Sequence, residues 1–172
     1  MKNFLLGLIF ALVLVAGGVL VYFGMGFAPV ATAAPPMPME RQLAGMALHA
    51  TISKQPMAQS PLPADETNLT AGARVYHEQC AVCHGLAGSA ETAIAKGMFP
   101  HPPQLFQGHG VTDDPAGETY WKAANGIRLT GMPGYKGSLS DTELWQVSLM
   151  LANADKLPPA AKAVVSEPLP AK

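Results

Sequence analysis

Charge of either sign is scarce in this chain, and its first part has almost none. Only 13% of the 172 residues are charged, and Lys2 is the only charged side chain before Glu40. The part from Glu40 onward carries 10 basic and 12 acidic residues, a formal charge of −2. Without a basic surplus the chain has no field that attracts a phosphate backbone, so we predict no nucleic-acid partner.

The uncharged part contains a long apolar run over residues 4–28. A helix of about 25 residues spans about 37 Å, more than the roughly 30 Å hydrocarbon core of a bilayer. Residues 1–28 are therefore expected to be a cytoplasmic N-terminus followed by one membrane helix, which contacts lipid. The positive charge at Lys2 predicts that everything after this helix is exported. A cleaved signal sequence remains the alternative, because Ala31-Thr32-Ala33 resembles a cleavage site.

Prolines divide the rest of the chain. Eleven of the 16 prolines lie outside residues 68–157, and proline-rich segments favour extended connectors. We expect a stalk over residues 29–67 with a short helix at about 40–55, a domain over 68–157 and a loose tail over 158–172. A domain of about 90 residues buries little surface by itself, which predicts that another group completes its core.

The chain has only two cysteines, and both belong to Cys80-Ala81-Val82-Cys83-His84. This is the C-x-x-C-H pattern of covalent c-type haem attachment. Two thiols at this spacing can add to the two vinyl groups of one porphyrin, while the imidazole of the next residue reaches the iron. A thioredoxin-like thiol pair, half of a zinc site and a simple disulfide are the alternatives. The first would need a β-α-β pattern and the second two further ligands, and neither is evident in the sequence.

At this point the sequence resembles the class I cytochrome c family, over about residues 68–157. The resemblance is closest to the small single-haem cytochromes that bacteria export or tether to the membrane. It rests on four pieces besides the cysteine motif: Gly72 and Tyr76 in a first helix, Pro102-Pro103-Gln104-Leu105, Gly131-Met132-Pro133 and a last helix. The resemblance implies an all-α class I cytochrome c fold around one covalent haem c, on the periplasmic side of a bacterial cytoplasmic membrane.

The residues themselves favour two packed helices. Gly72 and Tyr76 are four positions apart, so they share a helix face on which a second helix can approach the backbone closely. Ser140 and Glu143 form a capping-box pattern that opens a helix containing Leu144 and Trp145. We expect these two helices to pack together and to hold the fold.

A methionine is the expected second axial ligand of the iron. Nine methionines are present, and Met132 stands out because glycine and proline surround it, which favours an irregular loop. Its thioether can take the sixth iron position opposite His84, which raises the reduction potential and closes the iron to substrate. Met98 is the main competitor, and His101 and His109 are possible nitrogen ligands.

Other residues are expected around the haem. The resemblance assigns the carbonyl of Pro103 as the acceptor for the second ring nitrogen of His84, as metal-bound histidines require. Further expected contacts are pocket walls at Leu105, Phe106, Ile127 and Leu129, propionate contacts at Trp121, Arg128 or Tyr135, and basic residues near the haem edge at Lys96, Lys122, Arg128 and Lys136. The candidate cofactor-binding set is Cys80, Cys83, His84, Pro103, Leu105, Arg128 and Met132, with His84 and Met132 as iron ligands.

These features predict an electron carrier and not an enzyme. A monohaem cytochrome with His/Met ligation would pass single electrons from a respiratory complex or periplasmic dehydrogenase to an oxidase or another cytochrome. A first alternative is an electron-accepting subunit dedicated to one dehydrogenase or oxidase complex. A haem enzyme or gas-binding cytochrome with an open sixth position, and a thiol redox protein without haem, are further alternatives.

Overall fold

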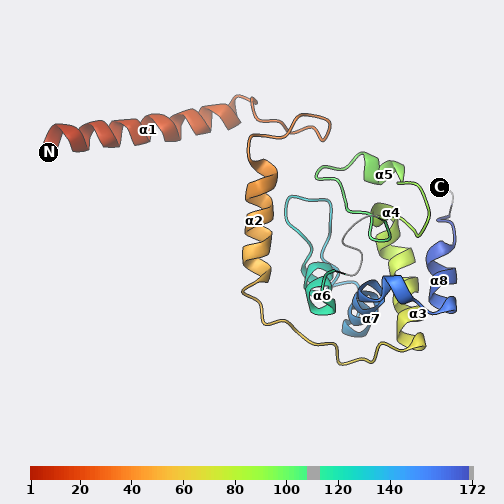
Figure 1. Cartoon of the computed structure of the whole chain (residues 1–172). Helices are drawn as coiled ribbons and strands as arrows, with labels where there is room; N and C mark the ends of the chain where they lie inside the picture. Colours follow the sequence, from red (N-terminus) through yellow and green to blue (C-terminus); the bar gives the residue numbers. More distant parts are fainter. Residues whose placement is uncertain (108–112, 171–172) are drawn as a thin grey trace. The chain divides into compact units, whose positions relative to one another are not determined.

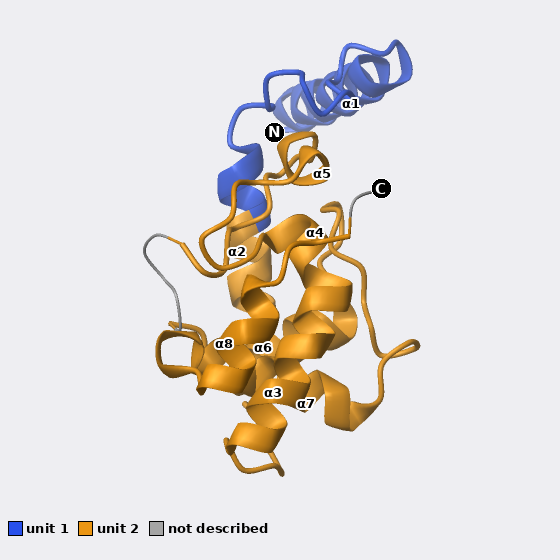
Figure 2. Cartoon of the chain, turned by 90° about the vertical axis from the view of Figure 1, so that its right-hand side faces the viewer, with its two compact units in different colours: residues 1–44 blue, residues 45–172 orange. Residues whose placement is uncertain are grey.

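The computed structural model describes residues 1–107 and 113–170, and these two ranges contain helices and no β-strand (Figure 1). The all-α prediction is therefore confirmed. The chain divides into two compact units, residues 1–44 and residues 45–172, which Figure 2 distinguishes by colour.

The first unit is dominated by the helix α1 (Lys2–Gly24). Its large apolar side chains, from Phe4 to Phe23, are exposed. The helix is long and apolar enough to cross a membrane. The helix α2 (Glu40–Ile52) follows after residues 25–39, and the division between the two units falls within it. It lies close to the short helix expected at about 40–55.

The second unit contains the remaining helices. They are α3 (Glu66–Val75), the π-helical turn η1 (Tyr76–Cys80), α4 (Ala81–His84), α5 (Ala93–Lys96), α6 (Ala116–Asn125), α7 (Asp141–Ala152), the 3-10 turn η2 (Ala154–Lys156) and α8 (Pro159–Ser166). The helix α3 packs against both α7 and α8, and α6 packs against the other side of α7 (Figure 1).

Side-chain caps begin the two central helices. The Asp65 carboxylate accepts a hydrogen bond from the backbone N–H of Asn68 at 2.9 Å and so caps α3. At α7, the Ser140 hydroxyl accepts from the N–H of Glu143, while the Glu143 carboxylate accepts from the N–H of Ser140 at 2.8 Å. The predicted capping box is present, and it satisfies N–H groups that a helix start leaves without partners.

The expected close approach of two helices occurs at Gly72. A Cβ at this position would overlap the backbone carbonyl of Gln146 and would lie 2.9 Å from the Cβ of Met150, so α7 passes directly over the α3 backbone. Tyr76 and Met150 are completely buried beside this crossing. The core of the second unit is therefore built on the α3–α7 pair, as the positions of Gly72 and Tyr76 predicted.

Residues 158–172, expected to form a loose tail, instead contain the packed helix α8. Proline at its first turn is compatible with a helix start, since the missing N–H would have no partner there. Ala161 and Val165 share one face, four residues apart, and are 0% and 1% exposed in the core. This segment is part of the domain because its short apolar face covers α3.

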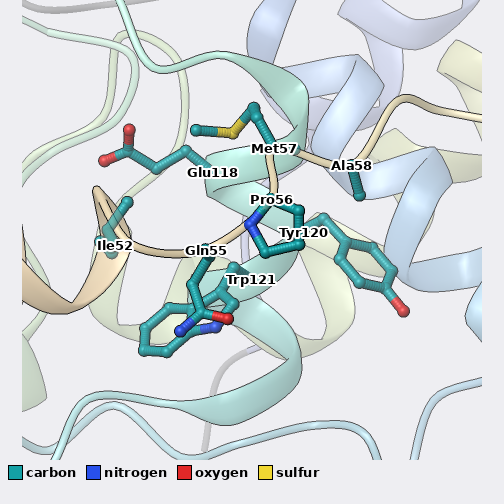
Figure 3. Close-up of a pocket in the computed structure, with 9 residues that line it drawn as sticks. Ile52, Gln55, Pro56, Met57, Ala58, Glu118, Tyr120 and Trp121 are labelled. Atoms are coloured by element: carbon teal, nitrogen blue, oxygen red, sulfur yellow. The ribbon is translucent and has the colours of Figure 1, made fainter.

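The connector after α2 also packs more closely than a free stalk would. Ile52 is buried, and the carbonyl of Ala58 lies so close to Gly117 on α6 that a Cβ there would overlap it. Figure 3 shows Pro56, Met57 and Ala58 passing Tyr120 and Trp121. These five residues line a cavity of about 100 Å³. Residues 52–58 are thus a docked strap on α6, which the glycine at 117 permits.

Candidate haem-attachment site

The cysteine motif lies where α3 continues through η1 into α4. The N–H of Ala81 donates to the carbonyl of Tyr76, five residues back. The turn that leads into α4 is therefore a π turn, which holds one residue more than an α-helical turn. Cys80 and Cys83 are half-buried free thiols. The chain leaves α4 at Gly85, whose φ of 74° is a conformation that favours glycine.

His84 has a geometry suited to binding a metal. Its Nδ1 lies 2.8 Å from the carbonyl oxygen of Pro103. Because a carbonyl only accepts, Nδ1 carries the ring proton and Nε2 keeps a free lone pair. Burial lowers the pKa of His84, and the hydrogen bond to Pro103 opposes this shift without cancelling it. The ring is therefore neutral near pH 7, which is the form that binds iron.

The Pro103 segment is tied to the motif by further hydrogen bonds. The N–H of Leu105 donates to the carbonyl of His84 at 3.3 Å, and Gln104 Nε2 donates to the carbonyl of Cys83 at the same distance. From the other side, the Tyr76 hydroxyl donates to the carbonyl of Gly85 at 2.7 Å. These contacts fix the backbone around His84, and with it the direction in which the ring points.

The Cys80 thiol lacks the lowered pKa of a reactive cysteine. Burial raises the pKa of the Cys80 thiol to about 12, with a smaller contribution from Cys83. Reactive cysteines in thioredoxin-like motifs have a lowered pKa instead, because the thiolate is the nucleophile. No group of three or more His, Cys, Asp or Glu side chains suited to a metal occurs among residues 1–107 and 113–170. The described residues therefore support neither the thiol redox nor the zinc alternative.

The loop that carries Met132 is irregular but tightly held. The Thr130 hydroxyl accepts from the N–H of Met132 at 3.1 Å and donates to the carbonyl of Ile127 at 2.7 Å. The carbonyl of Met132 accepts from the N–H of Ile127 at 3.2 Å. Two glycines, Gly126 and Gly134, let the loop fold back on the end of α6, since a Cβ at Gly126 would lie 2.5 Å from the N of Gly134. Met132 thus has a fixed backbone without being in a helix.

The competing ligands lie in different surroundings. The Met98 side chain contacts Gly131, so it lies against the same loop as Met132. His101 is exposed, and its Nε2 lies 3.0 Å from Glu91 Oε1 on the surface. His109 is outside the described residues. Met98 therefore stays the competitor with the best position.

Of the other residues expected to contact the haem, some pack against the core and others are exposed. Leu105 and Phe106 pack against the core, with Phe106 edge-on to Tyr76 at a centroid distance of 5.1 Å. Arg128 and Leu129 are exposed, and Leu129, at 91% exposure, has a φ of 61°. Ile127 is half-buried.

Three predicted haem-edge residues have protein contacts that the sequence did not indicate. Trp121 lines the cavity beside the docked strap, and the Tyr135 hydroxyl donates to the carbonyl of Gln79 at 2.9 Å. Lys122 pairs with Asp114 and with Glu118 Oε1, so its charge is neutralised locally. Of the basic residues expected to steer a partner, Lys96, Arg128 and Lys136 are exposed.

The backbone contacts of Tyr76, Gln104 and Tyr135 were also missed. The sequence does not indicate which backbone carbonyl a tyrosine or glutamine side chain will bond to, because this depends on how distant segments meet. For Tyr76 the signal was partial: a buried tyrosine hydroxyl normally needs a partner. The identity of that partner required the structure.

Two comparisons with known proteins find similarity in this region. Residues 67–149 match the family model for cytochrome C oxidase, cbb3-type, subunit III. The chain is also 32% identical over 97 residues to a thiosulfate dehydrogenase of Stutzerimonas stutzeri (strain A1501). That similarity covers 56% of this chain and 30% of the relative, so the chain spans under a third of the length of that protein. No solved structure matches the chain significantly.

The residues present fit a covalently bound porphyrin. Two free thiols lie three positions apart, and the neutral imidazole that follows has its Nε2 free. A thioether lies on a loop with a fixed backbone. Two thiols at this spacing are the groups that attach c-type haem, and imidazole and thioether are the iron ligands of cytochromes c.

Proposed function

We propose that this chain, which contains a class I cytochrome c domain with one covalent haem c, transfers single electrons between a donor and an acceptor protein while anchored to a membrane. The observation that carries the proposal is the geometry of His84. Its Nδ1 is 2.8 Å from the Pro103 carbonyl, which leaves Nε2 as the one ring nitrogen able to bind iron. An imidazole held in this way at the end of a C-x-x-C-H motif is suited to c-type haem.

The proposed roles follow from the donor atoms. The sulfurs of Cys80 and Cys83 would hold the haem through thioether bonds, and His84 Nε2 and the Met132 sulfur would bind its iron. When bound, haem c supplies one-electron changes between ferric and ferrous iron. The Pro103 carbonyl increases the basicity of the His84 ring. Leu105 would form part of the apolar pocket, and the exposed Arg128 would contact a haem propionate.

Ligation by Met132 favours a carrier over an enzyme. A thioether bound to the iron would leave no open site for a substrate or a gas, and it would raise the reduction potential relative to a second nitrogen ligand. The rigid loop supports this role, because Thr130 and Ile127 fix the Met132 backbone on both sides.

The length and apolar surface of α1 are the basis for a proposed location of the protein in the cell. This helix would span a bacterial cytoplasmic membrane once, with the N-terminus in the cytoplasm and the haem domain in the periplasm. Confinement near the membrane raises the effective concentration of the domain toward membrane-bound partners. The partners would be a quinol-oxidising complex or a periplasmic dehydrogenase as donor, and an oxidase or another cytochrome as acceptor.

A second candidate is a subunit dedicated to one complex. The match to a family model named for a subunit of cbb3-type oxidase favours an oxidase, and the similarity to a thiosulfate dehydrogenase favours a dehydrogenase. Copurification from solubilised membranes separates the two candidates. A stoichiometric complex that persists through several columns supports the dedicated subunit, whereas a monomeric haem protein supports the carrier.

Substitution of Met132 tests the ligation. Met132→Ala should lower the reduction potential and allow rapid, complete binding of carbon monoxide to the ferrous protein. Met98→Ala is the matched control, because it removes the other thioether beside the same loop. If Met98→Ala opens the iron and Met132→Ala does not, the ligand is Met98. A pyridine haemochrome assay on exported protein tests the cofactor itself.

A further inference from the structure

Two tyrosine hydroxyls bond to the backbone at the two ends of the cysteine motif. At one end, Tyr76 donates to the carbonyl of Gly85 at 2.7 Å, directly after His84. At the other end, Tyr135 donates to the carbonyl of Gln79 at 2.9 Å, directly before Cys80. The segment from Cys80 to His84 is thus fixed at each boundary by a side chain from outside it.

The Tyr135 bond joins two segments that are far apart in sequence. Gln79 and Tyr135 are separated by 56 residues, and Tyr135 comes three residues after Met132. The hydroxyl therefore links the loop of the proposed iron ligand Met132 to the segment that carries the other proposed ligand, His84.

The backbone of Tyr135 is itself held in place. Its N–H donates to the carbonyl of Ala123 on α6 at 2.9 Å, and its own carbonyl accepts from the N–H of Leu139 at 2.8 Å. The Tyr135 hydroxyl therefore extends from a backbone that is hydrogen-bonded on both sides.

The other end of this bond needs such support. Gln79 belongs to the π-helical turn η1, where the hydrogen-bond register changes before α4. A π turn inserts one extra residue into a helix and is a point at which the helix can shift. A hydrogen bond to the Gln79 carbonyl opposes such a shift.

We infer that Tyr135 is a positioning residue for the proposed iron ligand Met132: its hydroxyl fixes the Met132 loop against the Cys80–His84 segment. This inference rests on the proposed His84/Met132 ligation. Tyr76 is its counterpart at the far end of the motif, where it holds the peptide after His84. Without the Tyr135 hydroxyl, the loop can move away from the motif. The Met132 thioether then competes less well for the iron with ligands from solution.

The test is Tyr135→Phe in the full-length haem protein, which keeps the ring and removes the hydroxyl. Tyr120→Phe is the matched control, since the Tyr120 hydroxyl donates to Asp141 and its ring stacks on Trp145, and neither partner belongs to the motif. The measurement is the affinity of added imidazole for the ferric iron, which must displace the methionine. The near-infrared band of methionine-ligated ferric haem is followed in parallel.

We expect Tyr135→Phe to bind imidazole about fivefold more tightly than the wild type, in proportion to the loss of one hydrogen bond. Tyr120→Phe should stay within about twofold of the wild type, although it also loses a hydrogen bond. Thermal unfolding of both variants shows whether general destabilisation accounts for the change, since it would raise imidazole affinity in both.

Either of two results overturns the inference, and the second also overturns the proposed ligation by Met132. If the wild type shows the methionine band and Tyr135→Phe binds imidazole no more tightly, Tyr135 does not position the ligand and the proposed ligation stands. If Met132→Ala leaves the band and the imidazole affinity unchanged, the ligation by Met132 is wrong and the inference fails with it.

Discussion

Adding one methyl group at Gly72 should destabilise the haem domain strongly. In Gly72→Ala the new Cβ would overlap the carbonyl of Gln146 and lie 2.9 Å from Met150 Cβ. Backbone atoms cannot swing aside as a flexible side chain can, so α3 and α7 must separate along their contact. The perturbation is therefore overpacking at the centre of the fold.

The size of the effect follows from two opposing terms. Overpacking a buried site costs about 1–3 kcal/mol, and a clash with backbone belongs at the upper end. Alanine in place of glycine inside a helix stabilises the helix by about 1 kcal/mol. The net loss is about 2 kcal/mol, which for a domain of this size lowers the melting temperature by roughly 8–16 °C.

The assay is thermal unfolding of the detergent-solubilised full chain, followed by circular dichroism in the haem absorption band. Gly45→Ala is the control, because Gly45 lies in α2 and nothing lies within 4 Å of a Cβ there. This variant should unfold at or slightly above the wild-type temperature. If Gly72→Ala melts within about 2 °C of the wild type, the α3–α7 crossing is looser than the structure indicates.

Two further substitutions test the cap and the strap. The Ser140 hydroxyl and then its N–H lower the pKa of Glu143 from its ordinary value of 4.5, so the stabilisation is present above pH 4.5 and is lost as the pH falls through the lowered value. Glu143→Gln should therefore flatten the acid side of a plot of melting temperature against pH, and parallel curves for both proteins would contradict this. Gly117→Ala should release the strap at residues 52–58 and speed its cleavage by a protease about tenfold or more, without a change in the haem spectrum. Gly137→Ala, where a Cβ has open space, is the control, and equal cleavage rates would show that the strap is not docked through Gly117.

Local signals in the sequence accounted for the elements that depend on short-range chemistry. Ser140 and Glu143 predicted a capping box because both partners lie within one helical turn. Gly72 and Tyr76 predicted a packed helix face for the same reason. The motif ending at His84 carries its chemistry in five consecutive residues, and the Pro103 carbonyl lies at the position that the family resemblance implied.

The features that the sequence did not reveal depend on segments that meet only in the folded chain. The helix α8 has an apolar face of only a few residues, so its stability comes from packing on α3 and not from its own pattern. The strap on α6 depends on the missing side chain at Gly117, which looks like any other glycine in sequence. The bond between Tyr135 and Gln79 crosses 56 residues and has no local signature.

The docked strap changes how far the haem domain can travel if α1 anchors the chain. If residues 53–65 were free, the link from residue 25 to α3 would reach about 115 Å, with 28 extended residues at roughly 3.4 Å each and the 13-residue helix α2 at roughly 1.5 Å each. Because residues 52–58 pack on α6, the link ends with α2, and residues 25–39 together with α2 reach about 70 Å. The accessible volume scales with the cube of that length, so the domain would sample a space roughly fourfold smaller. Its local concentration at a neighbouring membrane protein rises by the same factor.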